Sequence, residues 1–298
     1  MDVRNVQKTG NMYYVYLPTR WCKKHSINSS SKVGVSTDSE GGLLVLPEFS
    51  EKEEKHLKLS LDEEDKDLII KLIVACYINP ITSFKINLGE KIDFSKLLTE
   101  KKFGGLDLIE MDGNKISYES TLSVTKPGAL LKTMVRKIKN LLLVKIDGGS
   151  KDLMHKYEEE IDKSHFLIDK AVISSLSFSE ILDTPLKHVD LFYLSIISQN
   201  LEGLADHILL LDESKRSFLK KIVDIVEQLQ VILEDMNSDD KSKKFNYKLA
   251  LEFTKLVSGI EPVKVKDLQT YDKKRIRKDL MNISEVLIDW SITKEIGK

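Results

Sequence analysis

The sequence predicts a multidomain α+β protein whose three segments differ in their patterns of apolar residues. Residues 1–50 alternate apolar and polar positions between turn residues, which is typical of short strands. Residues 51–124 mix strand-like and helix-like stretches, and residues 125–298 carry apolar residues at helical spacing almost throughout. A chain of 298 residues is long enough for two or three domains, so we expect one domain from each segment.

Four strand-like stretches make up the first segment: VRNVQKTG, MYYVYLP, SKVGVSTD and GGLLVLP. The alternation in Tyr13–Val15–Leu17 indicates half-buried strands, and the pair Gly41–Gly42 marks a hairpin turn. Pro18 ends the second strand, and TRWCKKHSI after it predicts a short basic helix. The segment therefore has the order strand, strand, helix, strand, turn, strand.

The middle segment alternates between the two kinds of pattern. Its stretches are KHLKLSL, DEEDKDLIIKLIVACYI, TSFKINL, DFSKLLTEKKF, GLDLIEM and KISYEST. This βαβαββ order predicts a small α/β sandwich with its helices on one face. The segment contains no motif that indicates a function.

The last segment predicts an all-α bundle. Turns rich in Gly, Pro, Asp and Asn divide it into helices near residues 130–145, 151–177, 186–211, 214–236, 243–258 and 272–295. Six helices are compatible with two copies of a three-helix unit.

Two acidic pairs in this segment are the strongest functional signal. Glu158 and Asp162 in YEEEID, and Glu202 and Asp206 in NLEGLADH, each place two carboxylates one turn apart on a predicted helix. Like charges at this spacing repel, and a cation held between two helices would neutralise them. Because 31% of the residues are charged, the spacing alone favours a solvated helix face, with a metal site as the alternative.

The surroundings of the second pair predict a site at the surface of the bundle. An apolar stripe runs along this helix through Tyr193, Ile197, Leu201, Leu204, Ile208 and Leu211. Glu202 and Asp206 project from nearly the opposite side, so an ion held there would be half exposed. His207 follows Asp206 directly and is either an additional ligand or, as we expect, part of the helix packing surface.

NLEGLADHILLL and EEEIDKSHFLI resemble the paired E/D-x-x-x-D motifs of the PhoU family, and the resemblance extends over residues 125–298. It implies a PhoU-like bundle of two three-helix units. It also implies a divalent or trivalent metal ion (Fe, Zn, Mn or Mg) with the ligands Glu158, Asp162, Glu202 and Asp206. Alignment of residues 280–285 on 201–206 keeps the apolar register but places Met281 at the first acidic position. Glu285 and Asp289 would leave at most a weakened second site.

VRNVQKTGNMYYVYLPTRWCKK and GGLLVLP resemble the SpoVT-AbrB swapped-hairpin domain. The resemblance implies that two chains interlace into one β-barrel, which makes the protein a homodimer. It also implies that basic side chains contact DNA, namely Arg4, Lys8, Arg20, Lys23 and Lys24. Residues 1–48 hold six Lys or Arg against four acids, so a domain that only dimerises stays an open alternative.

An AbrB-like domain followed by an α/β segment and a PhoU-like bundle resembles archaeal phosphate uptake regulators. This implies a dimeric, non-enzymatic, phosphate-responsive regulator that controls phosphate uptake or transcription, with DNA and a phosphate transporter or signalling protein as partners. A metal-dependent enzyme acting on a phosphorylated substrate and a structural adaptor without metal are the alternatives. GxSxG, HExxH and Walker-type motifs are absent from the sequence, which disfavours the enzyme.

Composition adds an expected location. The 46 basic and 47 acidic residues give no overall polarity towards nucleic acid or membrane. The longest apolar run, Leu68–Ile78, contains Lys71 and is too short to cross a bilayer. The two cysteines, Cys22 and Cys76, have no CxxC spacing and favour a reducing compartment. Together with the polar N-terminus, these features predict a cytoplasmic protein without a signal peptide or membrane insertion.

Overall fold

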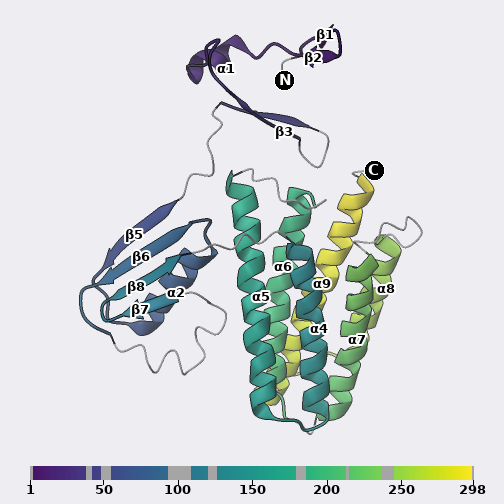
Figure 1. The fold of residues 1–298 in the computed structure, drawn as a ribbon. Helices are drawn as coiled ribbons and strands as arrows, with labels where there is room; N and C mark the ends of the chain where they lie inside the picture. Colours follow the sequence, from purple (N-terminus) through teal and green to yellow (C-terminus); the bar gives the residue numbers. More distant parts are fainter. Residues whose placement is uncertain are drawn as a thin grey trace. The chain divides into compact units, whose positions relative to one another are not determined.

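The computed structural model describes residues 3–37, 42–47, 55–92, 109–119, 126–178, 186–212, 215–235 and 245–296. The chain divides into two compact units, Met1–Glu53 and Glu54–Lys298. The described part is a mixed α+β protein with small sheets and a helical C-terminal region, as predicted (Figure 1).

The first unit contains two separate hairpins and a short helix. Strands β1 (Gln7–Thr9) and β2 (Met12–Tyr14) pair antiparallel, helix α1 spans Thr19–Lys24, and β3 (Gly34–Thr37) pairs antiparallel with β4 (Leu43–Leu46). Gly10 has φ of +59° in the turn between β1 and β2, a conformation that favours glycine. The described residues of one chain form no closed barrel. A swapped barrel requires a second chain and stays a prediction.

The apolar side chains of this first unit face solvent. None of the residues in it whose exposure the structure describes is buried. Tyr13 is 68% exposed, Val15 47% and Val35 60%. The prediction that Tyr13 and Val15 are half-buried is wrong for a single chain, because both side chains are exposed in the part of the chain that the structure describes.

The second unit begins with a four-stranded sheet. Its elements are β5 (His56–Leu61), α2 (Lys66–Ile78), β6 (Ser83–Leu88), β7 (Ile109–Asp112) and β8 (Lys115–Glu119). The strand order is β5-β6-β8-β7, with β5 and β6 parallel and the other neighbours antiparallel. Helix α2 provides the crossover that two parallel strands require. The predicted helix around 93–103 lies outside the described residues.

Helix α2 covers one face of this sheet (Figure 1). The Asp65 side chain caps the helix by accepting hydrogen bonds from the backbone N–H groups of Asp67 and Leu68. Ile69 and Ile73 of α2 are fully buried, together with Ile86 of β6. Alternate side chains of β6 and β8 point to this core, which is the pattern of a sheet covered on one side.

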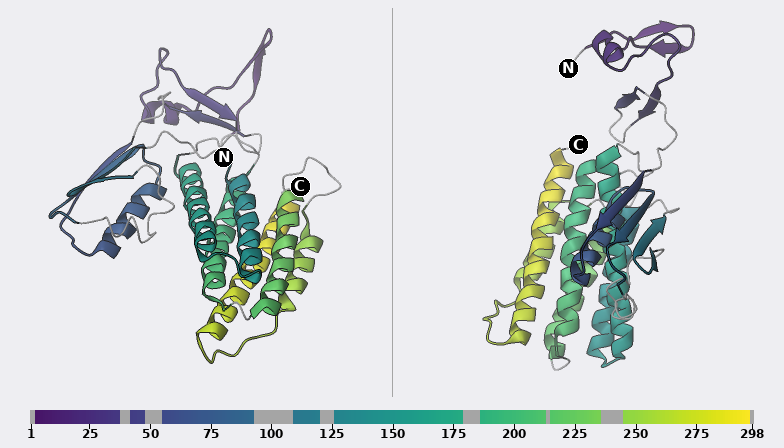
Figure 2. Two further views of the ribbon diagram at one scale, coloured as in Figure 1. Left: turned by 60° about the horizontal axis from the view of Figure 1, so that its bottom comes forward. Right: turned by 90° about the vertical axis from the view of Figure 1, so that its left-hand side faces the viewer.

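Six helices follow, close to their predicted positions: α4 (Pro127–Ile146), α5 (Lys151–Phe178), α6 (His188–Leu210), α7 (Arg216–Asp235), α8 (Tyr247–Ser258) and α9 (Leu268–Ile296). They run alongside one another in both views of Figure 2. One continuous apolar core receives side chains from all six. Helix α4 packs against α5, α6 and α7, and α9 packs against α6 and α8. Because some of these contacts join the first three helices to the last three, the division into two three-helix units stays a prediction.

Helix α5 also contacts the sheet domain. The Lys170 ammonium on α5 is only 9% exposed and donates a hydrogen bond of 2.8 Å to the Tyr118 hydroxyl of β8. It lies 4.8 Å from the ring centroids of both Tyr77 and Tyr118, within the range of a cation–π contact. Phe166, one turn earlier, packs against the core of the sheet domain.

Among the described helices, none combines the length and apolar character needed to span a bilayer.

Candidate metal centre

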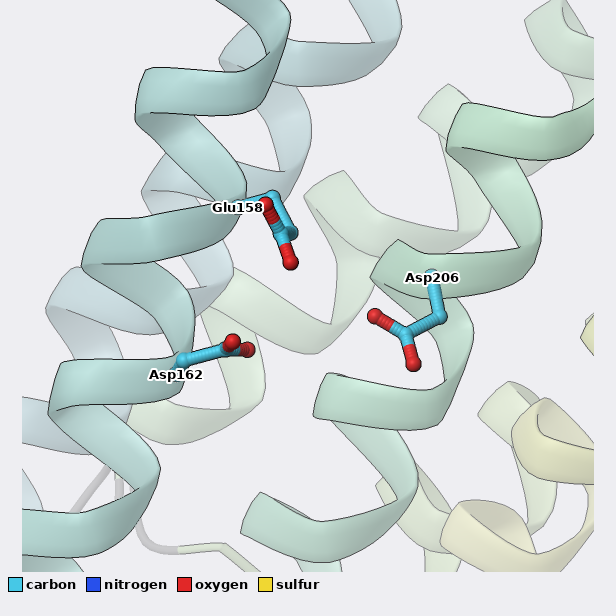
Figure 3. Close-up of side chains that lie close together, drawn as sticks. All are labelled: Glu158, Asp162 and Asp206. Atoms are coloured by element: carbon cyan, nitrogen blue, oxygen red, sulfur yellow. The ribbon is translucent and has the colours of Figure 1, made fainter. Parts of the chain in front are cut away.

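The packing of α5 against α6 brings the two acidic pairs together. Each of Glu158, Asp162 and Asp206 offers a carboxylate oxygen, and these three oxygens lie within 4.8 Å of one another. Figure 3 shows Glu158 and Asp162 projecting from α5 and Asp206 projecting towards them from α6. The i,i+4 spacing places the two α5 carboxylates one above the other. The predicted pairs therefore converge from neighbouring helices.

Apolar neighbours fix the rotation of both helices. On α5 the side chains of Met154, Ile161 and Ile168 are buried, and on α6 those of Leu201 and Leu204 are buried. Glu158 and Asp162 lie beside the α5 stripe and are partly exposed. The site is thus at the edge of the core, which confirms the prediction of a half-exposed position.

Glu202 is the fourth predicted ligand, and it lies in the same group of charges. It interacts electrostatically with Asp206, with Glu158 of α5 and with Asp279 of α9. Glu202 is partly buried although it projects away from the buried stripe of α6. The reason is that α6 packs on one flank against α5 and on the other against α9.

Crowding of carboxylates in a partly dry site raises their proton affinity. Burial, and then the charges of Glu158, Glu202 and Asp206, raise the pKa of Asp162 to about 8. Burial, and then the charges of Asp206 and Glu158, raise the pKa of Glu202 to about 7. Burial also raises the pKa of Asp206, although neighbouring His207 opposes the shift. At neutral pH, Asp162 is therefore mostly protonated and Glu202 about half protonated, and a cation would compete with these protons for the carboxylates.

One oxygen of the group has no hydrogen-bond partner. Asp162 Oδ1 is buried and accepts no hydrogen bond from the described residues. A buried acceptor of this kind costs about 1–3 kcal/mol when it is left unsatisfied. A cation bound between Glu158, Asp162 and Asp206 would satisfy it.

His207 does not have a free nitrogen for a metal. Its Nδ1 lies 3.0 Å from Oδ1 of Asp272, and the Arg275 Nε–H donates to its Nε2 at 3.3 Å. Because Nε2 accepts, the ring proton resides on Nδ1 and is donated to Asp272. This confirms the expectation that His207 belongs to the packing surface, here between α6 and α9.

Sequence reasoning missed one acidic residue next to the site, Asp279 of α9. It is 5% exposed, and its Oδ2 is buried without a hydrogen-bond partner among the described residues. Burial raises the pKa of Asp279, while Arg275 opposes the shift. In the sequence, Asp279 lies on an apolar stripe, three residues after Ile276 and four before Ile283, and this position could have indicated that it is buried. Asp279 has no acidic partner at i,i+4 spacing on this stripe, so the pattern that identified the other acidic residues does not include it.

The acidic pair on α9 that would leave a weakened second site lies at the surface. Glu285 and Asp289 are both exposed. Among the described residues, no group of three potential metal-binding side chains includes either of them. The pair has the solvated character that spacing alone also allowed for the first site.

The five predicted DNA-binding residues all lie at the surface of the first unit. Arg20, Lys23 and Lys24 belong to α1, where the i,i+4 spacing places Arg20 and Lys24 on one side. Lys8 lies on β1 with its ammonium 5.2 Å from the Tyr13 ring, and Arg4 precedes that strand. The structure thus brings three of the cations together on one short helix.

Comparison of this chain with protein-family models, with curated proteins and with solved structures found no match. The resemblances to PhoU and to SpoVT-AbrB therefore rest on the sequence motifs alone.

Asp162→Asn should stabilise the metal-free protein at high pH. A carboxyl pKa near 8 in the fold, against about 4 in the unfolded chain, means that the folded state binds the proton more tightly. The free energy of unfolding should then fall between about pH 4 and pH 8, by up to about 1.4 kcal/mol per pH unit for this group. The amide has no such dependence, so its advantage should be large at pH 8.5 and vanish near pH 4.

Thermal unfolding of chelator-treated protein over this pH range measures the effect. Glu252→Gln, at an exposed position of α8, is the matched control and should follow the wild type at every pH. Equal melting temperatures for Asp162→Asn and the wild type at pH 8.5 would contradict the electrostatic description of the site.

Proposed function

We propose that this protein is a metal-dependent, phosphate-responsive regulator. Its helical bundle would bind one or more divalent or trivalent cations through Glu158, Asp162, Glu202 and Asp206. The observation that carries the proposal is the convergence of two acidic pairs from α5 and α6, with three oxygens within 4.8 Å of one another. Neighbouring ligands of one ion are separated by such distances when metal–oxygen bonds are about 2.0–2.6 Å long.

The ligand chemistry narrows the choice of ion. All four proposed ligands are carboxylates, which suit hard cations such as Mg, Mn or Fe, and Zn also accepts them. Thiol and imidazole ligands are not part of the group, since His207 is occupied by Asp272 and Arg275. The partly exposed position of Glu158 and Asp162 would leave room for water or a phosphate oxygen on the same ion.

The N-terminal unit would join two chains. Val35 and Leu43 are both exposed. Val35 pairs with Val45, and Leu43 lies two residues from Val45 on β4, so Val35 and Leu43 share one face of the β3–β4 hairpin. None of the side chains described in this segment of about 50 residues is buried, and such a segment cannot offset the conformational entropy lost on folding. Burial of this face against a second copy, as in the swapped-hairpin domain that it resembles, would supply the missing core.

DNA contact would come from Arg4, Lys8, Arg20, Lys23 and Lys24, whose number doubles in the dimer. Phosphate contacts of this kind release counterions, so their affinity decreases as the salt concentration rises. The metal state of the bundle would then bias the docking of a transporter, a signalling protein or the DNA-binding unit.

Metal content is the direct test of the bundle site. Protein purified without chelator should contain near-stoichiometric metal by mass spectrometry, and Glu202→Ala combined with Asp206→Ala should lower it to background. Glu285→Ala with Asp289→Ala removes an equally spaced but exposed pair and should retain the metal. Absence of metal in the wild type, before and after incubation with Fe, Zn, Mn and Mg, would exclude the site and favour a structural adaptor.

The same samples separate the regulator from an enzyme. A phosphoesterase would hydrolyse a generic aryl phosphate in the presence of Mn or Mg, and the activity would disappear with Glu202→Ala. We expect metal binding without such turnover.

The N-terminal unit yields a prediction for assembly and DNA binding. Val35→Lys with Leu43→Lys should convert the dimer into a monomer in sedimentation equilibrium, because two charges cannot be buried there without partners. Ser29→Lys, at an exposed turn position, should leave the dimer intact. Arg20→Ala with Lys24→Ala should stay dimeric and bind DNA more weakly, with a smaller salt dependence. A monomeric wild type, or an unchanged DNA shift in the alanine variant, would refute the corresponding assignment.

The phosphate response can be tested in the host cell. Deletion of the gene should change phosphate uptake or the transcripts of phosphate-responsive genes during phosphate starvation. Complementation with the wild type should restore the response, whereas Glu202→Ala with Asp206→Ala should not. Identical uptake and transcripts with and without the gene would remove phosphate as the signal while leaving metal binding unaffected.

A further inference from the structure

Polar pairs follow one another along the interface of α6 and α9. His207 pairs with Asp272, and Asn200 Oδ1 accepts a hydrogen bond of 2.8 Å from Asn282 Nδ2. Further along, Tyr193 pairs with Thr293, and Asp190 accepts a hydrogen bond from Trp290. From His207–Asp272 through Asn200–Asn282 to Tyr193–Thr293, the residue numbers fall on α6 as they rise on α9, so these three pairs mark an antiparallel register.

Asp279 breaks this sequence of pairs. The residue opposite it on α6 is Gly203, which has no side chain to offer. A β-carbon built on Gly203 would lie 3.6 Å from Asp279 Oδ2. Because Asp279 is 5% exposed and Oδ2 has no partner in the described part of the chain, its carboxylate is dehydrated without a compensating hydrogen bond.

The charge of Asp279 lies close enough to the acidic group to interact with it. Its carboxylate interacts with Glu202 and with Asp206, which precede and follow Gly203 on α6. Repulsion from these two charges adds to the cost of burial. Arg275 and Lys278 of α9 provide opposing positive charge, but in the described part of the chain neither forms a hydrogen bond with Oδ2.

We propose that Asp279 contributes its carboxylate to the metal centre, and that a bound hard cation therefore joins α9 to α5 and α6. This inference rests on the metal-binding function proposed above and adds a helix from the second half of the bundle to the site. A cation beside Glu202 and Asp206 would supply the positive charge that the buried Oδ2 lacks. Ion binding would then tie the two halves of the helical domain together.

Gly203 is consistent with this arrangement. Glycine in the interior of a helix is less favourable than alanine, and here it lies in the middle of the 23-residue helix α6. Its missing side chain keeps the space between Asp279 and the α6 carboxylates open. Gly203 thus makes α6 less stable than alanine would. Within the described α6–α9 interface, it lies where an alanine methyl group would be beside the unpaired Oδ2 of Asp279.

Binding of Mn²⁺ to the chelator-treated full-length chain tests the proposal. Asp279→Asn keeps the shape of the side chain and removes its charge, so it should weaken Mn²⁺ binding by about tenfold or more in competition with a chelating dye. Asp289→Asn removes the same charge from an exposed position ten residues further along α9 and should bind as the wild type does. Amide exchange of α9 near Asp279 should slow on addition of Mn²⁺ in the wild type and in Asp289→Asn, but not in Asp279→Asn.

Gly203→Ala distinguishes a loss of Mn²⁺ binding from a folding defect. It should raise the melting temperature of the metal-free protein, because alanine favours the helix, and at the same time weaken Mn²⁺ binding. Asp279→Asn with wild-type affinity and unchanged exchange protection would overturn the role of Asp279 while the proposed metal site stands. A wild type that binds no Mn²⁺ would overturn the proposed metal site and this inference together.

Discussion

Repulsion between carboxylates at the contact of α5 and α6 is the constraint on which the organisation of the bundle depends. The apolar stripes of the two helices must pack, and this packing forces Glu158, Asp162 and Asp206 to within 4.8 Å of one another. Partial burial raises the pKa values of Asp162 and Glu202 to about 8 and about 7. The fold therefore requires protons or a cation at this contact, and the pH or the metal supply decides which is bound.

The surrounding contacts link this site to the rest of the second unit. Helix α5 carries Glu158 and Asp162 and, two turns later, the buried Lys170 that binds Tyr118 of the sheet domain. Helix α6 carries the other pair and is held to α9 through His207 and Asp272. A change in the charge state of the site thus acts on helices that contact both the sheet domain and the second half of the bundle.

Local patterns in the sequence were sufficient for the helices and for both acidic pairs, because apolar periodicity and i,i+4 spacing depend on one helix at a time. The flank of α6 that faces α9 could not be predicted in this way. The partial burial of Glu202 was therefore not predicted, and Asp279, which meets Gly203 from another helix, was missed. The alternation in MYYVYLP predicted the strand correctly, but among the described residues Tyr13 and Val15 are exposed, so the strand pattern alone did not predict their burial.

Anomalous diffraction from crystals grown with Mn²⁺ would locate a metal ion at the acidic group without reference to activity. We expect an anomalous peak within bonding distance of Glu158, Asp162 and Asp206, on the side of α6 that carries Glu202. Only water beside these carboxylates, or an anomalous peak elsewhere on the protein, would contradict metal binding by the two acidic pairs.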